Sequence, residues 1–281
     1  MTYESMLRTF SPKGIWPQDD EWGMHDYTRE GAQGCTSFNE IIAKGYGEPQ
    51  SAKEFACLAQ WVNYDGHRSL FESRSQNRKG LLMWMSHSCW PSMVWQTYDY
   101  YFEPTAAYFA IKKASEPLHI QWNPATDEVE VVNYSAGTHK GLTAKVQVLN
   151  MDASVAWEKE ATVDSNEDTT DKCIKLEFPE NLSKVHFIKM TLVEDGKVIS
   201  DNFYHRSLEE NNYQDLQKLP KVALQSATTV DKNADGTWSA VSVIENKTST
   251  PALMIRLNVV GGKDGQQILP VFYSDNYFSL L

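Results

Sequence analysis

The spacing of hydrophobic positions divides the chain into a helical part and a β part. In residues 51–73, Phe55 and Leu58 belong to a run of apolar positions at the three- to four-residue spacing of a helix with one buried face. Ser51 and Glu54 form a capping box at its start, because the Ser hydroxyl can accept a backbone N–H that the first turn leaves unpaired. The pattern therefore predicts one long helix, and a second capping box at residues 37–40 predicts a shorter one before it.

A short apolar run follows the long helix. Gly80 precedes residues 81–83 (Leu-Leu-Met), and a continuous run of this kind is typical of a parallel strand covered on both faces. Pro104 suits the first turn of a last helix, which should end before Pro117. Helix, buried strand and helix form the closing unit of a barrel. Residues 1–117 are therefore predicted to be the C-terminal part of a (β/α)8 TIM barrel.

From about residue 118 the hydrophobic pattern changes to a period of two. Apolar and polar residues alternate in 128–132, 144–149, 172–178 and 186–192. Strands of this length and spacing predict an immunoglobulin-like β-sandwich over 118–207. The polar segment 208–220 is interpreted as a linker, and 221–281 as a second immunoglobulin-like β domain. The predicted fold class is thus multidomain, α/β followed by all-β.

Composition excludes several classes of partner. The chain has 281 residues, enough for two or three domains, and a formal net charge of −11. This charge argues against nucleic acid and anionic membranes, which both need a basic footprint. No apolar run is long enough to span a membrane. The seven histidines and four cysteines do not stand at metal-binding spacing, so no metal site is assigned.

Aromatic and polar residues gather just after the predicted strand. Trp84, Trp90 and Trp95 are interspersed with His87 and Asp99. In a (β/α) barrel, the carboxyl end of a strand is where substrates bind. Indole rings converging there would make a floor on which a sugar ring can stack.

The same stretch resembles the last strand and following loop of the catalytic barrel in glycoside hydrolase family 2. The resemblance rests on Gly80-Leu-Leu-Met-Trp, on Trp-Pro-Ser at 90–92, on Trp-Gln-Thr-Tyr-Asp-Tyr-Tyr at 95–101, and on Ala-Tyr-Phe-Ala-Ile-Lys-Lys-Ala-Ser-Glu-Pro-Leu-His at 107–119. It points to the β-mannosidases and exo-β-glucosaminidases. The family usually has asparagine where this chain has Ser-His-Ser-Cys at 86–89, a difference that leaves the sugar open.

The resemblance implies an oligosaccharide substrate, hydrolysis of β-linked mannosides or glucosaminides with retention, and no metal or organic cofactor. It also implies a secreted or periplasmic setting. Retaining glycosidases use two carboxylates, and in this family both are glutamates on strands that would precede residue 1. The segment 2–7 resembles the stretch that follows the nucleophile. No glutamate of this chain is therefore assigned to catalysis; Glu4 is expected to cap the first helix, and the chain alone is expected to be inactive.

Part of the substrate pocket is carried over by resemblance. The candidate substrate-binding residues are Trp84, Trp90, Trp95, His87, Trp22 and His25. Packing in the barrel core or in loops is the alternative role for the tryptophans. Asp99 is expected to hold its loop by accepting backbone N–H groups. The second β domain is expected to be cut short, because the family's terminal domain continues beyond this point.

A second hypothesis is a non-catalytic carbohydrate-binding or structural module, in which the sandwiches and tryptophans bind glycans without cleaving them. The sequence leaves open which sugar is recognised, exo or endo action, the oligomeric state, and whether the catalytic glutamates lie on the same polypeptide.

Overall fold

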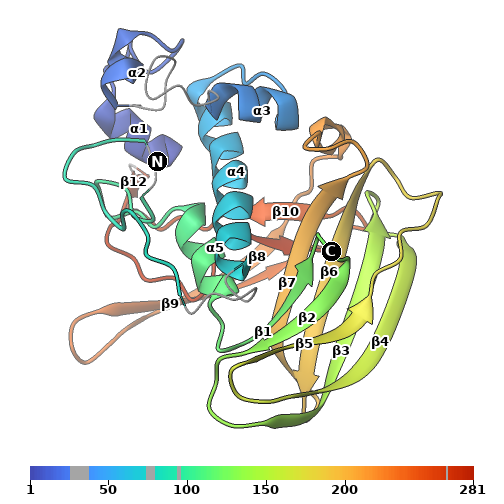
Figure 1. Ribbon diagram of the computed structural model, residues 1–281. Helices are drawn as coiled ribbons and strands as arrows, with labels where there is room; N and C mark the ends of the chain where they lie inside the picture. The colour runs from blue at the N-terminus through green and yellow to red at the C-terminus, as the bar shows by residue number, and fades with distance from the viewer. Residues whose placement is uncertain (26–37, 74–79, 94–95, 264) are drawn as a thin grey trace.

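The computed structural model describes residues 1–25, 38–73, 80–93, 96–263 and 265–281. A helical part leads into a β-sandwich, and the last residues return along the helical part (Figure 1). The helices are α1 (Tyr3–Thr9), α2 (Asp20–His25), α3 (Phe38–Tyr46), α4 (Ala52–Glu72) and α5 (Ala106–Ala114). None of the described helices is long and apolar enough to cross a membrane.

Helix α4 confirms the long predicted helix and its cap. The Ser51 hydroxyl accepts a hydrogen bond from the Glu54 backbone N–H at 3.2 Å, and the Glu54 carboxylate accepts one from the Gln50 N–H at 2.8 Å. One donor of the first turn, the Glu54 N–H, and one backbone N–H just before the helix are thereby satisfied. The other predicted capping serine, Ser37, lies outside the described residues, although α3 forms where a short helix was expected. Helix α5 begins later than predicted: Thr105 is its N-cap, so Pro104 lies before the helix and not in its first turn.

The prediction of a strand at residues 81–83 is wrong. These residues belong to no strand, and Leu82 is fully exposed, at 104% of its reference area. A parallel strand is stable only when its backbone groups pair with neighbours on either side. No parallel strand lies beside 81–83 among the described residues. The apolar run therefore lies open as a loop, and no part of a (β/α)8 barrel is evident in those residues of 1–117 that the structure describes.

Two antiparallel sheets form the sandwich. One has the strand order β1 (Leu118–Asn123), β2 (Glu128–Asn133), β5 (Thr169–Lys175). The other has the order β4 (Val155–Ser165), β3 (His139–Asn150), β6 (Val185–Glu194), β7 (Lys197–Ser207). The four predicted segments fall on β2, β3, β5 and β6, and only 172–178 extends beyond its strand. The fold class is thus confirmed for its β-sandwich.

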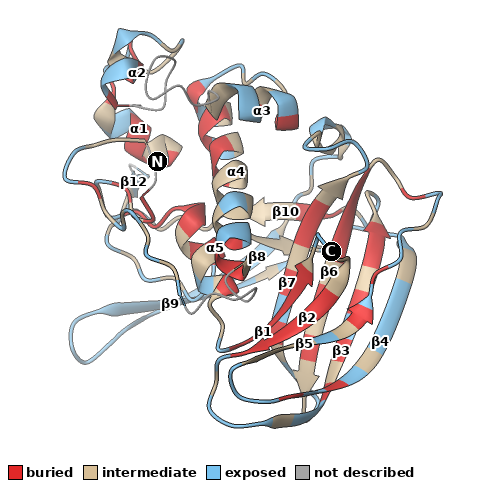
Figure 2. Ribbon diagram, viewed as in Figure 1, coloured by how far each residue is buried: buried red, intermediate tan, exposed pale blue. Residues whose placement is uncertain are grey.

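The sandwich core follows from the alternation along each strand. Val146 and Val148 on β3 lie beside their cross-strand partners on β6, Met190 and Ile188, and each is completely buried. Because successive side chains of a strand point to opposite faces, these residues fill the space between the sheets. Figure 2 shows the resulting buried stripes along β3, β6 and β7.

The C-terminal residues form short two-stranded sheets instead of a second closed sandwich. The antiparallel pairs are β8 (Gln225–Lys232) with β9 (Trp238–Glu245), β10 (Ala252–Ile255) with β13 (Phe278–Leu280), and β11 (Val260–Gly261) with β12 (Gln266–Gln267). The β8–β9 hairpin projects from the body and is exposed along its length (Figure 2). The segment interpreted as a linker includes the 3-10 helix η2 (Gln214–Lys218) and lies against α3, where Tyr213 N–H donates to Gly45 C=O at 2.7 Å.

A buried polar network joins α4 to the sandwich. The Glu72 carboxylate, at the end of α4, accepts hydrogen bonds from Asn202 Nδ2 at 2.8 Å and from the Tyr204 hydroxyl at 2.9 Å, both on β7. His119 on β1 lies between two carboxylates, with Nε2 at 3.2 Å from Glu72 and Nδ1 at 3.1 Å from Glu116. Only a doubly protonated imidazole donates to both carboxylates. The bonds to Glu116 and Glu72 therefore raise the pKa of His119 against the opposing effect of its burial.

This arrangement predicts a loss of stability as the pH rises above the ordinary pKa of histidine. The pKa of His119 is higher in the folded than in the unfolded chain, so its stabilising effect is complete below about pH 6.5 and is lost as pH rises through the folded value. Urea unfolding at a series of pH values should show this decrease, and His119→Gln should remove it. A His119→Gln protein with the same slope above pH 6.5 would contradict the prediction.

Candidate functional site

Several large apolar side chains are exposed on the loops between α4 and α5. Leu82 is joined there by Trp84 (77% exposed), Trp90 (50%), Phe102 (59%) and Tyr100 (40%). Scattered apolar side chains are normal on protein surfaces, but large aromatic residues in one short stretch mark a surface that contacts a ligand or another part of a protein. We call this set the aromatic loop surface.

The structure brings His25 and Trp90 together. Their rings are stacked, with centroids 5.4 Å apart and planes 10° from parallel. The His25 Nδ1 lies 2.5 Å from the Pro91 carbonyl, and Met93 N–H donates to the His25 carbonyl at 2.9 Å. These contacts fix the loop that carries Trp90 to the end of α2. His25 itself is buried, so Trp90 presents the surface and His25 supports it.

His87 lies in a second ring cluster. It stacks on Phe102 with centroids 4.6 Å apart and planes 15° from parallel, and more distantly on Tyr100 at 6.5 Å. Its Nε2 is buried and has no hydrogen-bond partner among the described residues. Trp84 lies on the same loops with most of its indole in solvent.

Trp22 lies in the core of the helical part and not on a surface that a ligand could contact. It is 1% exposed and packs against Phe10 at 5.3 Å and Phe55 at 5.0 Å between ring centroids. Its Nε1 donates to the Ile15 carbonyl at 3.1 Å. Trp22 therefore forms the centre of the helical core beneath the His25 contact, and it cannot touch a ligand in this structure. Trp95 lies outside the described residues.

Asp99 holds its loop, as expected. Its Oδ1 accepts hydrogen bonds from the N–H groups of Tyr101 at 3.0 Å and Glu103 at 3.1 Å. The Asp99 N–H in turn donates to the Glu103 carbonyl at 3.0 Å. The side chain is completely buried, so its role is to shape the loop that presents Tyr100 and Phe102.

Arg256 ties this loop to the C-terminal residues and was not found from the sequence. Its guanidinium donates to Glu4 at 2.8 Å and to Glu103 at 2.7 Å, so that it bridges α1 and the Asp99 loop. Glu103 is 2% exposed, and burial raises the pKa of its carboxyl against the opposing effect of Arg256. The expected capping role of Glu4 is wrong, because the Thr2 hydroxyl caps α1 and Glu4 pairs with Arg256 instead.

Two family models match the β part of the chain. The exo-β-D-glucosaminidase Ig-fold domain matches residues 202–281, and the mannosidase Ig/CBM-like domain matches residues 127–207. Together they cover the sandwich from β2 onward and the C-terminal hairpins.

The chain is also similar to full-length proteins named exo-β-D-glucosaminidase and to a solved exo-chitosanase. The exo-β-D-glucosaminidase of Amycolatopsis orientalis is 28% identical, over 99% of this chain and 30% of its own length. That of Streptomyces avermitilis is 30% identical, over 86% of this chain and 30% of its own length. The exo-chitosanase of A. orientalis, solved with PNP-β-D-glucosamine, superposes with a TM-score of 0.89 at 25% identity, over 99% of this chain and 37% of that one.

These matches are consistent with the C-terminal region of glycoside hydrolase family 2. The chain spans about a third of the length of the relatives it matches. Among the described residues, no group of histidine, cysteine and carboxylate side chains is arranged to hold a metal ion.

Proposed function

We infer that this chain is the C-terminal portion of a retaining exo-β-glycosidase that removes β-linked glucosamine or mannose residues from oligosaccharides. The observation that carries this proposal is the superposition on the exo-chitosanase, which extends over 99% of the chain and includes the loops between α4 and α5. The named glucosaminidase relatives favour glucosamine over mannose.

In this proposal the aromatic loop surface contacts the sugar at the cleavage site. Trp84 and Trp90 offer exposed indole faces, on which the apolar face of a pyranose ring can stack. His25 supports Trp90 from beneath, and His87 packs against the exposed ring of Phe102. Neither catalytic glutamate is assigned here, since both are proposed to lie on barrel strands outside this chain.

The proposed organisation follows the predicted boundaries. Residues 1–117 would belong to the end of the catalytic barrel, 118–207 to the first immunoglobulin-like domain, 208–220 to a connecting segment, and 221–281 to the second immunoglobulin-like domain. The barrel part would become regular only beside the other strands, where the open run 81–83 gains partners on both sides. By resemblance the whole enzyme would work outside the cytoplasm.

A non-catalytic glycan-binding module is the second candidate, favoured by the exposure of Trp84 and Trp90 in the chain as it stands. Titration of the isolated chain with glucosamine- and mannose-terminated oligosaccharides distinguishes the two. The glycosidase proposal predicts that Trp90→Ala leaves the measured affinity unchanged, because the cleavage site is incomplete without the barrel. Micromolar binding that is lost in Trp90→Ala would favour the module instead.

A further inference from the structure

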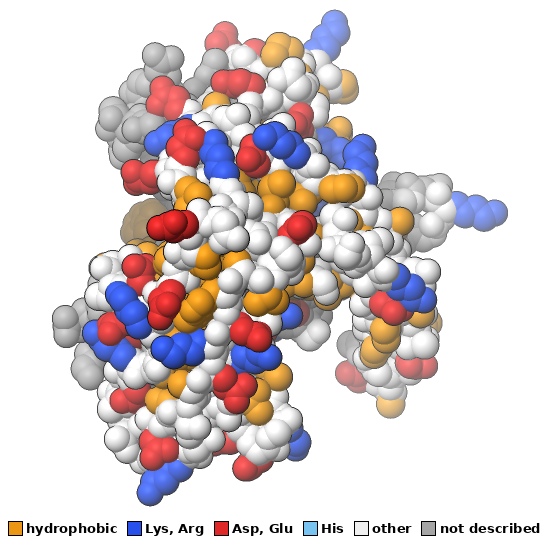
Figure 3. Space-filling view, turned by 90° about the vertical axis from the view of Figure 1, so that its right-hand side faces the viewer, with side chains coloured by type: hydrophobic (Ala, Val, Ile, Leu, Met, Phe, Trp, Pro, Cys, Tyr) orange, Lys and Arg blue, Asp and Glu red, His pale blue; other side chains and the backbone are white. Residues whose placement is uncertain are grey.

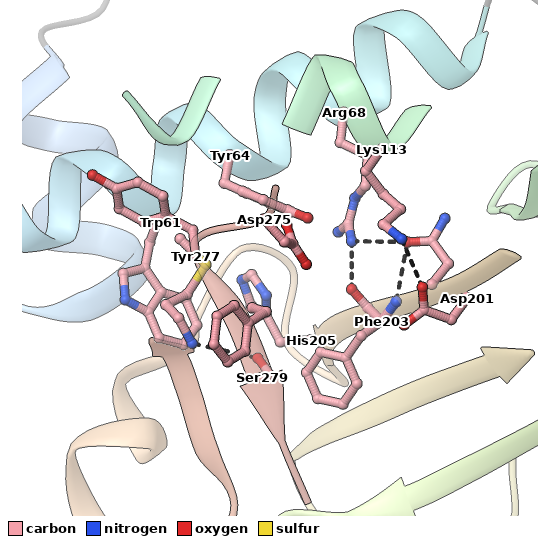
Figure 4. A pocket seen from close by; sticks show the side chains of 13 residues that line it. Trp61, Tyr64, Arg68, Lys113, Asp201, Phe203, His205, Asp275, Tyr277 and Ser279 are labelled. Atoms are coloured by element: carbon pink, nitrogen blue, oxygen red, sulfur yellow. Dashed lines mark hydrogen bonds and ion pairs between the residues drawn. The ribbon is translucent and has the colours of Figure 1, made fainter. Parts of the chain in front are cut away.

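The hollow between α4, α5, β7 and the C-terminal strands is too small to hold a sugar (Figure 4). Its volume is about 90 Å³, the space of roughly three water molecules. Lys113 and Arg68 beside it already pair with Asp201 and Asp65, each at 2.6 Å. Any contact between the sandwich side of the molecule and carbohydrate therefore involves side chains on its outer surface.

Three asparagines lie in the Asn-X-Ser/Thr motif to which N-linked oligosaccharides are attached, and the structure separates them. Asn133 is completely buried and Asn246 is half-buried. Each Nδ2 donates two hydrogen bonds to backbone carbonyls, which belong to Gly137 and Ser165 for Asn133, and to Thr250 and Leu280 for Asn246. A glycan replaces one Nδ2 hydrogen, so it would break one of these bonds at either residue.

The third motif asparagine, Asn181, is exposed in the connection between β5 and β6. The Leu182 N–H donates to the Pro179 carbonyl at 3.2 Å, which closes a β-turn with Asn181 at its third position. Leu182 is 6% exposed and anchors the turn in the sandwich core. Among the described residues, none forms a hydrogen bond with the Asn181 side chain. Its amide nitrogen is therefore free to carry a substituent.

An exposed aromatic ring precedes Asn181 by three residues and flanks the same turn. Phe178 is 37% exposed, and its ring packs edge-on against Trp122 at 6.2 Å and His186 at 5.8 Å between centroids. These contacts hold the ring in place and leave part of it open to solvent. The C–H groups of a sugar attached to Asn181 can pack on this open part. Phe178 is thus an observation, independent of the motif, that points to a sugar at this turn.

We propose that Asn181 is the attachment site of an N-linked oligosaccharide, whose first N-acetylglucosamine packs on Phe178. The donor is a lipid-linked oligosaccharide diphosphate. The Asn181 Nδ2 forms a bond to C1 of the sugar, and the C1–O bond to the diphosphate breaks. The lipid diphosphate leaves with the bonding electrons, and Nδ2 loses one proton. The encounter with this donor rests on the extracellular setting of the proposed function, whereas the site itself does not depend on glycosidase activity.

Ser183, the hydroxyl residue of the motif, sets the time of the transfer. In the folded chain its Oγ donates to the Val185 carbonyl at 2.6 Å and accepts from the Met151 N–H at 2.8 Å. Both bonds hold the segment that leads into β6, so a transferase cannot read this hydroxyl after folding. The oligosaccharide is therefore attached while the chain is still unfolded, and Leu182 then places the modified turn on the surface.

Secretion of the chain from yeast, behind a cleavable signal sequence, tests the site. Peptide mapping of the secreted protein should find the glycan on Asn181 at least tenfold more often than on Asn133 or Asn246. Asn181→Gln should be secreted without a glycan, and Asn246→Gln, the matched control at another motif, should keep it. Secreted protein without a glycan on Asn181, or with more glycan on Asn246, would overturn the proposal.

Trimming of the glycan to one N-acetylglucosamine with an endoglycosidase tests the packing on Phe178. The trimmed protein should unfold at a higher urea concentration than Asn181→Gln, and this difference should vanish when both carry Phe178→Ala. Phe272→Ala, at a ring that is 93% exposed outside the sandwich, should preserve the difference. A difference that survives Phe178→Ala contradicts the packing. None of these measurements uses glycosidase activity, so they stand or fall separately from the proposed function.

Discussion

Replacement of Arg68 by methionine is expected to lower the free energy of unfolding by about 3–5 kcal/mol, the range for removal of one partner of a buried ion pair. Arg68 is 1% exposed, pairs with Asp65 at 2.6 Å and lies over the Tyr204 ring at 4.0 Å. Methionine retains much of the apolar volume but leaves the carboxylate with one cation fewer. Urea unfolding followed by tryptophan fluorescence measures the change.

The control for this prediction is Lys218→Met, which removes an ion pair of the same 2.6 Å length whose lysine is 70% exposed. Exposed pairs contribute about 0–1 kcal/mol, so its effect should be small. The double variant Asp65→Asn with Arg68→Met should be less destabilised than the sum of the two single variants, because the two side chains interact. Equal effects of Arg68→Met and Lys218→Met would show that the α4–sandwich network does not stabilise the fold.

Arg256→Met is expected to cost about 2–3 kcal/mol, less than Arg68→Met because the Arg256 side chain is 22% exposed. Its loss leaves Glu103, which is 2% exposed, without a cation and frees the loop around Asp99. Limited proteolysis should therefore cut between residues 96 and 105 faster than in wild type, and urea unfolding gives the change in stability.

Glu103→Gln tests whether the unpaired Glu103 carboxylate is what destabilises the Arg256→Met protein. It removes the charge that Arg256→Met leaves uncompensated, so the double variant should regain part of the lost stability. Lys247→Met, at an exposed pair of 3.5 Å, should leave both stability and proteolysis unchanged. If Arg256→Met were cut at the wild-type rate, the C-terminal residues would not hold the Asp99 loop.

The β-sandwich was predictable because four of its strands, β2, β3, β5 and β6, each carry their own alternating pattern. In β3, the buried residues Val146 and Val148 alternate with polar ones, and the pattern is complete within a few residues of sequence. Helix α4 was predictable for the same reason, since Ser51 and Glu54 cap it locally. Boundaries were less certain, and β1, β4 and β7 were not predicted as separate strands.

The remaining features depend on residues far apart in the sequence. The run 81–83 has the composition of a buried strand, but strand formation requires neighbours that the described residues do not supply. Arg256 pairs with residues 252 and 153 positions away, and no spacing rule connects them. Trp22 and Trp90 belong to the same residue type, yet the packing of Phe10 and Phe55 buries one and leaves the other exposed.

Charged and hydrophobic side chains are distributed differently over the surface of the chain. On the face shown in Figure 3, acidic and basic side chains are interspersed, and hydrophobic ones gather mainly toward its middle. On this face the net charge of −11 is therefore not concentrated in a single acidic patch.

Hydrolysis of p-nitrophenyl β-D-glucosaminide by the purified chain tests the central claim most directly. The account predicts no turnover above the buffer rate, because the two carboxylates of a retaining glycosidase are proposed to lie outside this chain. Turnover that is abolished by substitution of one of its own glutamates, with Glu4→Gln and Glu103→Gln tested first, would contradict the account.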